Sequence, residues 1–377
     1  MFTRIMLFRT GVVASVVLLM GTVVLCSSCG VSSTQSGAVT RSLVYATQKL
    51  GVGANADFAS GPATIRRANV DGSHPLKIGV GSDPQISPDG REVAFIRDSG
   101  GYAYFKGLWA IPASGGKPRL LTLTYSYANG GVDYGWAPDS RHMVVEYERG
   151  FLRDPENLIY LLDTANRSQK LLASTTINKV PEFDYSSVTF SPDSQSLVYA
   201  ANRGGSETPE YPSDLYVADL KSGRTRQLTL GDATDPVWGP RGIAFSRAGG
   251  EIWLISGDGT NLHQIGSGHS LGWPVAWSAD GNRLLTDIRH WSMSSVEQNG
   301  LYPVDSFRVI DVPSGRVRFS GRGNPLALSS DGQVVLISTC WSTPSRGGGY
   351  IATISLTGGK PHAIITGGYS CDASWNR

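Results

Sequence analysis

The sequence predicts an all-β protein, a seven-bladed β-propeller whose blades are four-stranded antiparallel sheets. Three observations point to this fold. A four-residue turn motif recurs six times at nearly even spacing, alternating apolar stretches flank each copy, and the two ends of the chain carry complementary fragments of one further repeat. The 46 glycines and the many β-branched and aromatic residues favour strands and tight turns over helices. A ring of six blades, one for each turn motif, is the alternative.

The turn motif is close to Ser-Pro-Asp-Gly, and it joins the first two strands of each blade. Its copies are "SPDG" at Ser87, "APDS" at Ala137, "SPDS" at Ser191, "GPRG" at Gly239, "SADG" at Ser278 and "SSDG" at Ser329. Successive copies are 50, 54, 48, 39 and 51 residues apart. A short apolar stretch precedes each copy and an alternating stretch follows it, which is the pattern of a β-hairpin.

Two more strands complete each blade. The third strand is typified by "DLYVADL" at 214–220 and the fourth by "RQLTL" at 226–230, with a polar turn between them. Both sets have seven members although the turn motif has six copies. Four strands in each unit of 40 to 55 residues are typical of a propeller blade.

The chain ends supply the seventh blade. "RSLVYAT" at 41–47 nearly repeats the second strand "QSLVYAA" at 195–201, but no first strand precedes it. "ASWN" at 373–376 matches a first strand, and no second strand follows it. Pairing of the two fragments would close the ring and remove two open sheet edges. The 337 residues from 41 to 377 then give about 48 residues to each of seven blades.

These repeats resemble the TolB-type propeller repeats of bacterial envelope proteins. The stretches "DPVWGPRG", "SDLYVADLKSGRTRQLTL" and "VAWSADG" carry the resemblance, which covers 41–377. TolB itself joins an N-terminal α/β domain to a six-bladed ring, whereas this sequence predicts seven blades and no such domain. The resemblance therefore implies the propeller fold rather than the role of TolB.

The first 29 residues resemble a bacterial lipoprotein signal peptide. Arg4 and Arg9 precede an apolar run at 11–25, and "CSSCG" follows at 26–30. We expect Cys29 to be lipidated, with ordinary secretion and an uncleaved anchor as alternatives. Residues 30–40 would form a flexible tether and 41–377 the propeller. The protein is accordingly expected outside the cytoplasm in a bacterial cell envelope, as a monomer held to the membrane by its lipid.

The folded body carries no net charge. Of the 33 basic residues, Arg4 and Arg9 lie in the leader, and the remaining 31 balance 31 acidic residues. A nucleic-acid-binding domain is marked by an excess of basic residues, so no nucleic-acid partner is expected.

Long connections are predicted on one face of the ring, here called the loop face. It carries the connections between second and third strands and between successive blades, and long loops on a rigid scaffold commonly bind partners. Aromatic and charged residues in these loops suit an envelope protein or a glycan, although the rings could instead pack their own loops. The predicted binding rim comprises Tyr102, Phe105, Arg153, Asp154, His290, Trp291, Tyr302, Trp341 and Arg346.

Four aspartates recur four residues before the start of the turn motif, at the loop-face end of the innermost strand. They are Asp83, Asp133, Asp235 and Asp372, with Asp184 and Asn324 as further candidates. Around the mouth of the ring they could hold a cation or a basic peptide. The alternative is that each caps its own strand through local backbone bonds. No other cofactor and no resident metal are expected.

Cys340 and Cys371 are expected beside each other where the ring closes. In an exported protein they would form a disulfide, with two separate buried thiols as the alternative.

Catalytic signals are weak, and a non-enzymatic binding or scaffold protein is the favoured interpretation. "GHSLG" at 268–272 matches Gly-x-Ser-x-Gly, but no strand-to-helix elbow is predicted around it. His269, His290 and Asp287 could form a metal or acid/base group, although solvated loop histidines are the simpler interpretation. The alternative function is an extracellular polysaccharide lyase or hydrolase with its site at the mouth of the ring.

Overall fold

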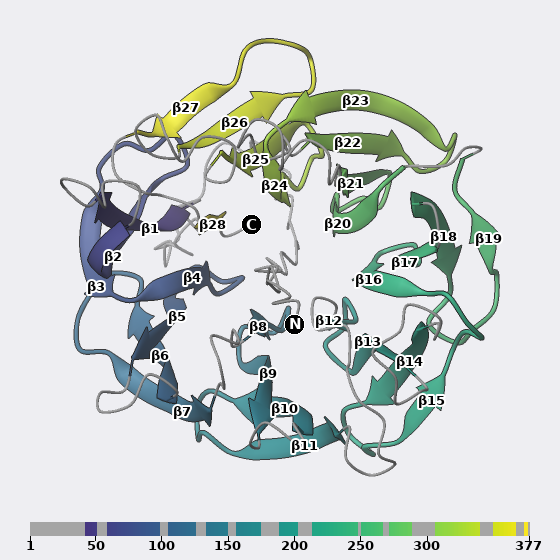
Figure 1. Ribbon diagram of the computed structural model, residues 1–377, viewed down its shortest axis with the longest axis horizontal. Coiled ribbons are helices and arrows are strands. Elements are labelled where there is room, and N and C mark those ends of the chain that lie inside the picture. Colours follow the sequence, from purple (N-terminus) through teal and green to yellow (C-terminus); the bar gives the residue numbers. More distant parts are fainter. Residues whose placement is uncertain are drawn as a thin grey trace, which may run out of the picture.

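The computed structural model is a ring of seven four-stranded sheets, which confirms the predicted seven-bladed propeller (Figure 1). The structure describes residues 42–50, 59–98, 105–125, 133–149, 156–174, 188–202, 213–247, 250–266, 271–288, 306–339, 350–366 and 373–375. Residues 1–41, which include the predicted signal peptide and tether, lie outside this set.

Each blade runs from an innermost to an outermost strand in chain order. The first complete blades are β4(Ser82–Ile86), β5(Glu92–Asp98), β6(Phe105–Pro112) and β7(Arg119–Tyr125); β8(Asp133–Trp136), β9(His142–Arg149), β10(Glu156–Asp163) and β11(Gln169–Ser174); and β12(Thr189–Phe190), β13(Ser196–Asn202), β14(Ser213–Asp219) and β15(Thr225–Gln227). The next are β16(Thr234–Gly239), β17(Gly242–Arg247), β18(Glu251–Ile255) and β19(His263–Gln264); β20(Trp273–Trp277), β21(Arg283–Ile288), β22(Ser306–Asp311) and β23(Arg316–Arg322); and β24(Asn324–Leu328), β25(Val334–Ser338), β26(Ile351–Ser355) and β27(His362–Ile365).

The seventh blade joins the two ends of the chain, as predicted. Its order is β28(Ala373–Trp375), β1(Ser42–Leu50), β2(Ala59–Asn69) and β3(Leu76–Val80). β28 pairs antiparallel with β1, so that Leu43 lies opposite Trp375 and Tyr45 opposite Ala373. Leu43 and Ala373 also share a buried cluster with Leu336 of the preceding blade. The closure is therefore held by strand pairing and by apolar packing together.

The core lies between the blades, because alternate residues of each strand point to opposite faces of its sheet. In β9, Met143 and Val145 pack with the β4–β7 blade, whereas Val144 between them packs with the β12–β15 blade. A strand with both faces buried is therefore apolar at consecutive positions, as in "MVV" at 143–145.

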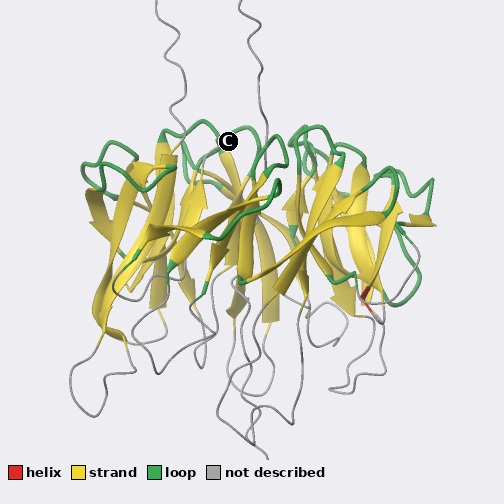
Figure 2. Cartoon of the chain, turned by 90° about the horizontal axis from the view of Figure 1, so that it is seen from above, coloured by secondary structure: helices red, strands yellow, loops and turns green. Residues whose placement is uncertain are grey.

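The two faces of the ring differ in how they are connected. Turns within the hairpins cluster on one face, the turn face, and Figure 2 shows most of the described connections (green) on that side. The strand ends that flank the undescribed segments, such as Asp98 of β5 and Phe105 of β6, lie at the opposite face, the loop face. In the part of the chain that is described, no helix has the length and apolar character to cross a membrane.

The turn motif recurs because its side chains satisfy the backbone of the turn. The Ser87 hydroxyl donates to Asp89 Oδ1 at 2.6 Å and accepts from the amide of Glu92 at 3.0 Å. Asp89 Oδ1 also accepts from the amide of Arg91 at 3.0 Å. The copies that begin at Ser191, Ser278 and Ser329 repeat these bonds. Each copy thereby fixes the register of its hairpin.

Basic residues at the start of three successive outer strands tie each blade to the next. Arg119 Nη1 donates to the Thr164 carbonyl at 2.6 Å, and Lys170 Nζ donates to the Leu220 carbonyl at 2.8 Å. Arg226 Nη2 likewise donates to the Gly257 carbonyl at 2.6 Å. Each acceptor lies in the turn between the two outer strands of the following blade, so the turn face is bonded across its rim.

The irregular fourth turn motif, "GPRG", does not interrupt the ring. A Cβ on Gly239 would lie 2.4 Å from the Trp277 ring of the next blade, so the absence of a side chain admits that indole. Trp277 Nε1 then donates to the Val237 carbonyl at 3.0 Å. In another blade Trp136 Nε1 makes the equivalent bond to the Gln85 carbonyl at 3.2 Å. Close packing between blades therefore accounts for the glycine that begins this copy.

Candidate functional site

Most of the predicted binding rim falls on residues that the structure leaves undescribed. Phe105 begins β6 at the loop face, Asn324 begins β24, and Asp83, Asp133 and Asp235 lie at the loop-face ends of β4, β8 and β16. The predicted residues outside the described set are Cys29, Tyr102, Arg153, Asp154, Asp184, His269, His290, Trp291, Tyr302, Cys340, Trp341, Arg346, Cys371 and Asp372. The predicted lipidation, the disulfide and the aromatic rim accordingly stay predictions.

Two of the predicted aspartates occupy strained positions at the inner rim of the ring. Asp83 and Asp235 each precede a proline, and their φ values of 51° and 50° place both in the left-handed region. The strand register shifts beside them, between Ser82 and Gln85 and between Thr234 and Val237. Bulges of this kind redirect side chains at strand ends. Asp235 is buried, with 6% of its surface exposed.

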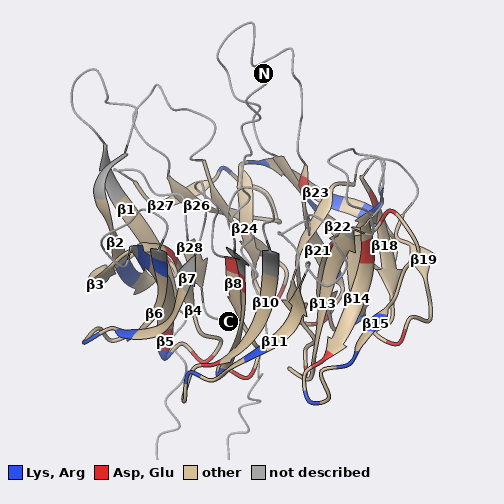
Figure 3. Cartoon of the chain, turned by 60° about the horizontal axis from the view of Figure 1, so that its bottom comes forward, with Lys and Arg blue, Asp and Glu red and all other residues tan. Residues whose placement is uncertain are grey.

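Asp133 lies directly across the hairpin from a second carboxylate, Glu146 of β9. Cross-strand partners share one face of a sheet, so the two side chains are neighbours. Their strand neighbours Tyr134 and Val145 pack on the opposite face, in the apolar cluster with the β4–β7 blade. Glu146 was not among the predicted site residues, and Figure 3 shows the acidic colouring of β8 inside the ring.

Burial and mutual repulsion favour the protonated forms of these two groups. Burial, reinforced by the negative charge of Asp83, raises the pKa of Asp133 to about 7. Burial and the charge of Asp133 raise the pKa of Glu146 well above its ordinary range. Only 6% of Glu146 is exposed, and no hydrogen bond or ion pair joins its carboxyl group to another described residue. Asp83, Asp133 and Glu146 are called the acidic site below.

Neutral groups hold the backbone around the acidic site. The Tyr134 hydroxyl donates to the carbonyl of Asp83, and Gln85 Nε2 donates to the carbonyl of Tyr134 at 2.8 Å. These bonds join β4 to β8, so the strands that carry Asp83 and Asp133 are fixed relative to each other.

The bond from Gln85 belongs to a repeated contact around the inner ring. Ser374 Oγ donates to the Pro84 carbonyl at 3.2 Å and Thr189 Oγ1 donates to the Pro236 carbonyl at 3.5 Å, each across one blade interface. The same hydroxyls accept from the amides of Ile86 at 3.0 Å and Trp238 at 3.1 Å. These hydrogen bonds join neighbouring inner strands across three blade interfaces. Asp83, Asp133 and Asp235 lie at the loop-face ends of the inner strands that are joined in this way.

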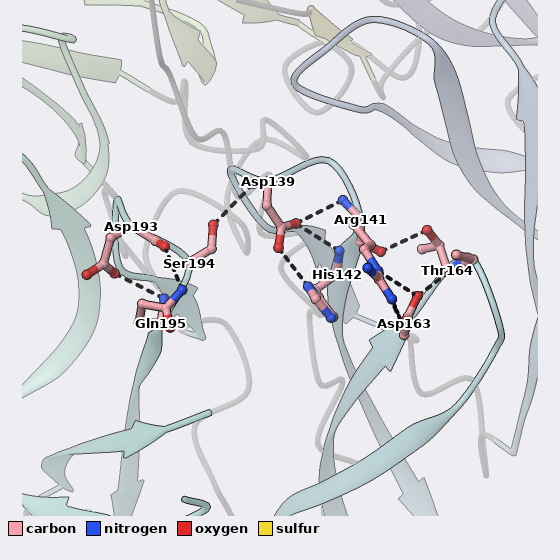
Figure 4. Close-up of polar contacts among 9 residues, drawn as sticks. Asp139, Arg141, His142, Asp163, Thr164, Asp193, Ser194 and Gln195 are labelled. Carbon is pink, nitrogen blue, oxygen red and sulfur yellow. Dashed lines mark hydrogen bonds and ion pairs between the residues drawn. The ribbon is translucent and has the colours of Figure 1, made fainter. Parts of the chain in front are cut away.

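The turn face offers a contrast, because its carboxylates are bonded within the protein (Figure 4). Asp163 accepts from Arg141 Nη2 at 2.7 Å, and Asp139 contacts His142 Nδ1 at 2.6 Å. The amide of Asp139 donates to Ser194 Oγ of the next blade at 3.1 Å. The bond from Arg141 lowers the pKa of Asp163. The charged residues named here therefore stabilise the turn face through hydrogen bonds and ion pairs within the protein.

The residues that suggested catalysis do not form a catalytic arrangement in the described part of the chain. Gly272, the last residue of "GHSLG", is followed directly by strand β20 rather than by a helix, so the setting of a nucleophile elbow is missing there. Asp287 of β21 is buried, with 7% exposed, opposite Trp273. Among the described residues, no group of three or more His, Cys, Asp or Glu side chains could hold a metal ion.

The fold and the site define the chain as a seven-bladed β-propeller with an acidic site at the inner rim of its loop face. No family model matches the sequence. One curated relative, "Uncharacterized peptidase YuxL" from Bacillus subtilis (strain 168), is 28% identical over 158 residues. That stretch is 40% of this chain and 24% of the relative, so the chain spans about a quarter of the length of the curated relative it matches.

Solved structures show similarity at the level of the fold. The β-propeller domain of the Trilobed protease from Pyrococcus furiosus is 13% identical, with a TM-score of 0.57, over 86% of this chain and 92% of that one. TolB from Acinetobacter baumannii is 15% identical, with a TM-score of 0.49, over 88% of this chain and 82% of that one. The propeller of the Trilobed protease has an open velcro topology, whereas here β28 pairs with β1.

Proposed function

We propose that this chain is a non-enzymatic binding propeller of the bacterial cell envelope, and that its loop face captures a protein partner. The observation that carries the proposal is that the carboxyl groups of Asp133 and Glu146 lie side by side at the inner rim without a described hydrogen-bond partner. These two carboxyl groups are neighbours, and no hydrogen bond joins either of them to another described residue.

The cost of such an arrangement supports a functional interpretation. Burying a carboxyl group without a hydrogen bond is unfavourable, and perturbed groups of this kind concentrate at functional sites. The turn face also carries charged side chains, but there Arg141 and His142 bond the nearby carboxylates. The carboxyl groups of Asp133 and Glu146, which no described side chain bonds, are therefore the better candidates for contacts with a partner.

The path of the chain also supports the loop face as the binding face. β1 begins at Ser42, and as the second strand of its blade it starts at the turn face. A tether of residues 30–40 that ran from a lipid on Cys29 would reach the ring from that side. The loop face would then point away from the membrane, toward partners in the surrounding compartment.

Photo-crosslinking from both faces tests the proposal. A photoreactive amino acid replaces Arg97 or Tyr350 at the loop-face ends of β5 and β26, and Lys117 or Lys221 in turns of the opposite face. We expect the loop-face positions to capture one protein in cells and the turn-face positions to capture none. Capture only from the turn face would overturn the proposal, and capture of glycan alone would replace the protein partner by a glycan.

A hydrolase or lyase with its site at the inner rim is the second candidate. The curated relative named as a peptidase favours it, and a carboxyl group with a pKa of about 7 could serve as a general acid. The purified chain is incubated with polysaccharides and with peptides, and Asp133→Asn and alanine variants of His269, His290 and Asp287 are compared. Cleavage that these variants abolish while the fold stays intact would establish the enzyme and remove the first proposal.

A further inference from the structure

We propose that the acidic site binds a protonated primary amine, supplied by a lysine side chain or by the N-terminus of a peptide. The inference rests on the proposed function, because it names the chemical group by which the partner is held. Asp133 and Glu146 would contact the ammonium group directly, and Asp83 would add negative charge from the neighbouring blade.

The placement of the three carboxylates makes one end of the site accessible. Asp133 is the first residue of β8, the innermost strand of its sheet, and it is partly exposed. Glu146 lies on the second strand of the same sheet, opposite Asp133, and is 6% exposed. A cation that approaches from the ring axis would therefore meet Asp133 on the innermost strand first, with Glu146 on the second strand behind it.

Glu146 is the observation that points to a ligand. It is more than nine-tenths buried and lies beside Asp133, and no described residue donates a hydrogen bond to its carboxyl group. The polar groups on the opposite face of the sheet, such as Tyr134, and on β4, such as Gln85, direct their hydrogen bonds to backbone carbonyls and not to Glu146. A cation at this place would supply hydrogen bonds that no described residue supplies, and it would offset the mutual repulsion that disfavours the ionised forms of Asp133 and Glu146.

The arrangement suits an ammonium group better than a metal ion or a guanidinium. Among the described residues, no three His, Cys, Asp or Glu side chains are grouped as a metal site of three protein ligands would require. An ammonium is a compact charge with three donors, so it can lie between two carboxylates from different strands. A guanidinium prefers a single carboxylate in a planar, two-bonded arrangement.

Calorimetric titration of the purified full chain with trilysine at pH 8 tests the inference. The wild-type protein should bind trilysine and should not bind trilysine whose amines are all acetylated. Glu146→Gln and Asp133→Asn keep the side-chain shapes and should each weaken binding at least tenfold. Asp258→Asn, an exposed turn-face position where asparagine can accept the same bond from the Thr260 amide, is the matched control and should bind like wild type.

The outcomes separate the inference from the proposed function. No binding of trilysine by wild type, or equal binding by Glu146→Gln and wild type, would overturn the inference. Displacement of trilysine by equimolar Ca²⁺ would replace the amine by a metal ion and would also overturn it. If loop-face crosslinking still captures a protein in those cases, the proposed function stands without the amine site. If trilysine binds as expected but no partner is captured from the loop face, the proposed function fails and the site alone remains.

Discussion

Replacing Asp133 by asparagine should change how the stability of the propeller depends on pH. The folded protein raises the pKa of Asp133 from its ordinary 3.8 to about 7. Between these two values the folded state holds a proton on Asp133 that the unfolded chain has released. Unfolding therefore releases a proton in this range, and the free energy of unfolding falls as the pH rises from about 4 toward 7.

The size of the effect follows from the two pKa values. Each pKa unit corresponds to about 1.4 kcal/mol, so the stabilisation present below pH 4 and lost above pH 7 is at most about 4 kcal/mol. Partial exposure of Asp133 and coupling to Glu146 reduce this upper limit. Asparagine resembles the protonated aspartate in shape and carries no charge, so Asp133→Asn should match wild type near pH 4 and exceed it in stability at pH 8.

Urea unfolding of the two proteins in parallel at pH 4.5 and pH 8 measures the difference. We expect the difference in free energy of unfolding to be at most about 1 kcal/mol at the lower pH and about 2 to 4 kcal/mol in favour of Asp133→Asn at the higher pH. Asp258→Asn, in which an exposed turn carboxylate is changed, should show no such gain. If the variant were less stable than wild type at pH 8, ionised Asp133 would be stabilised by the fold and its pKa would not be raised.

Three further predictions concern the ring itself. Ser374→Ala removes the acceptor of the Ile86 amide and the donor to the Pro84 carbonyl, and should lower the free energy of unfolding by about 1–3 kcal/mol. A urea titration should show this loss, whereas Ser168→Ala, at an exposed serine of a turn, should change little. Gly239→Ala places a Cβ 2.4 Å from the Trp277 ring and should cost roughly 1–3 kcal/mol, with an altered near-ultraviolet tryptophan signal; an unchanged signal would contradict the packing. Deletion of residues 371–377 removes β28 and should destabilise the whole ring, so a truncated chain that melted like the full one would disprove the closure.

The fold could be predicted because its information is local and repeated. The turn motif at Ser87 carries its own hydrogen bonds, and these set the register of the hairpin around it. The closure followed from the match of "RSLVYAT" to an internal second strand, and the pairing of Val44 with Ser374 bears it out. Six turn motifs alone would have suggested six blades, and the terminal fragments decided for seven.

The acidic site could be predicted only in part. The shared position of Asp83 and Asp133 before the turn motif placed both at the inner rim, where the charge of one acts on the other. Glu146 was missed because it lies within an apolar run, although the hairpin register that pairs Trp136 with Met143 also pairs Asp133 with Glu146. A carboxylate inside "MVVEY" was therefore the available signal.

The contacts between blades could not be predicted in the same way. The bond from Gln85 to the Tyr134 carbonyl joins residues 49 positions apart. Asp83 and Asp235 adopt left-handed conformations although each precedes a proline, which favours an extended conformation in the residue before it. The sequence alone would therefore have predicted the opposite, and the observed conformations depend on how neighbouring strands pack. Such features arise from packing in three dimensions and leave little trace in a single repeat.

The most direct test of the account is capture of the partner by each face of the same protein. Photo-crosslinkers at Arg97 and Tyr350 report on the loop face, and those at Lys117 and Lys221 report on the turn face. We predict that one protein is captured from the loop face alone, and that trilysine, but not acetylated trilysine, competes with its capture. Capture from the turn face, or capture from the loop face that Glu146→Gln and added trilysine both leave unchanged, would contradict the account of the acidic site as the point of contact.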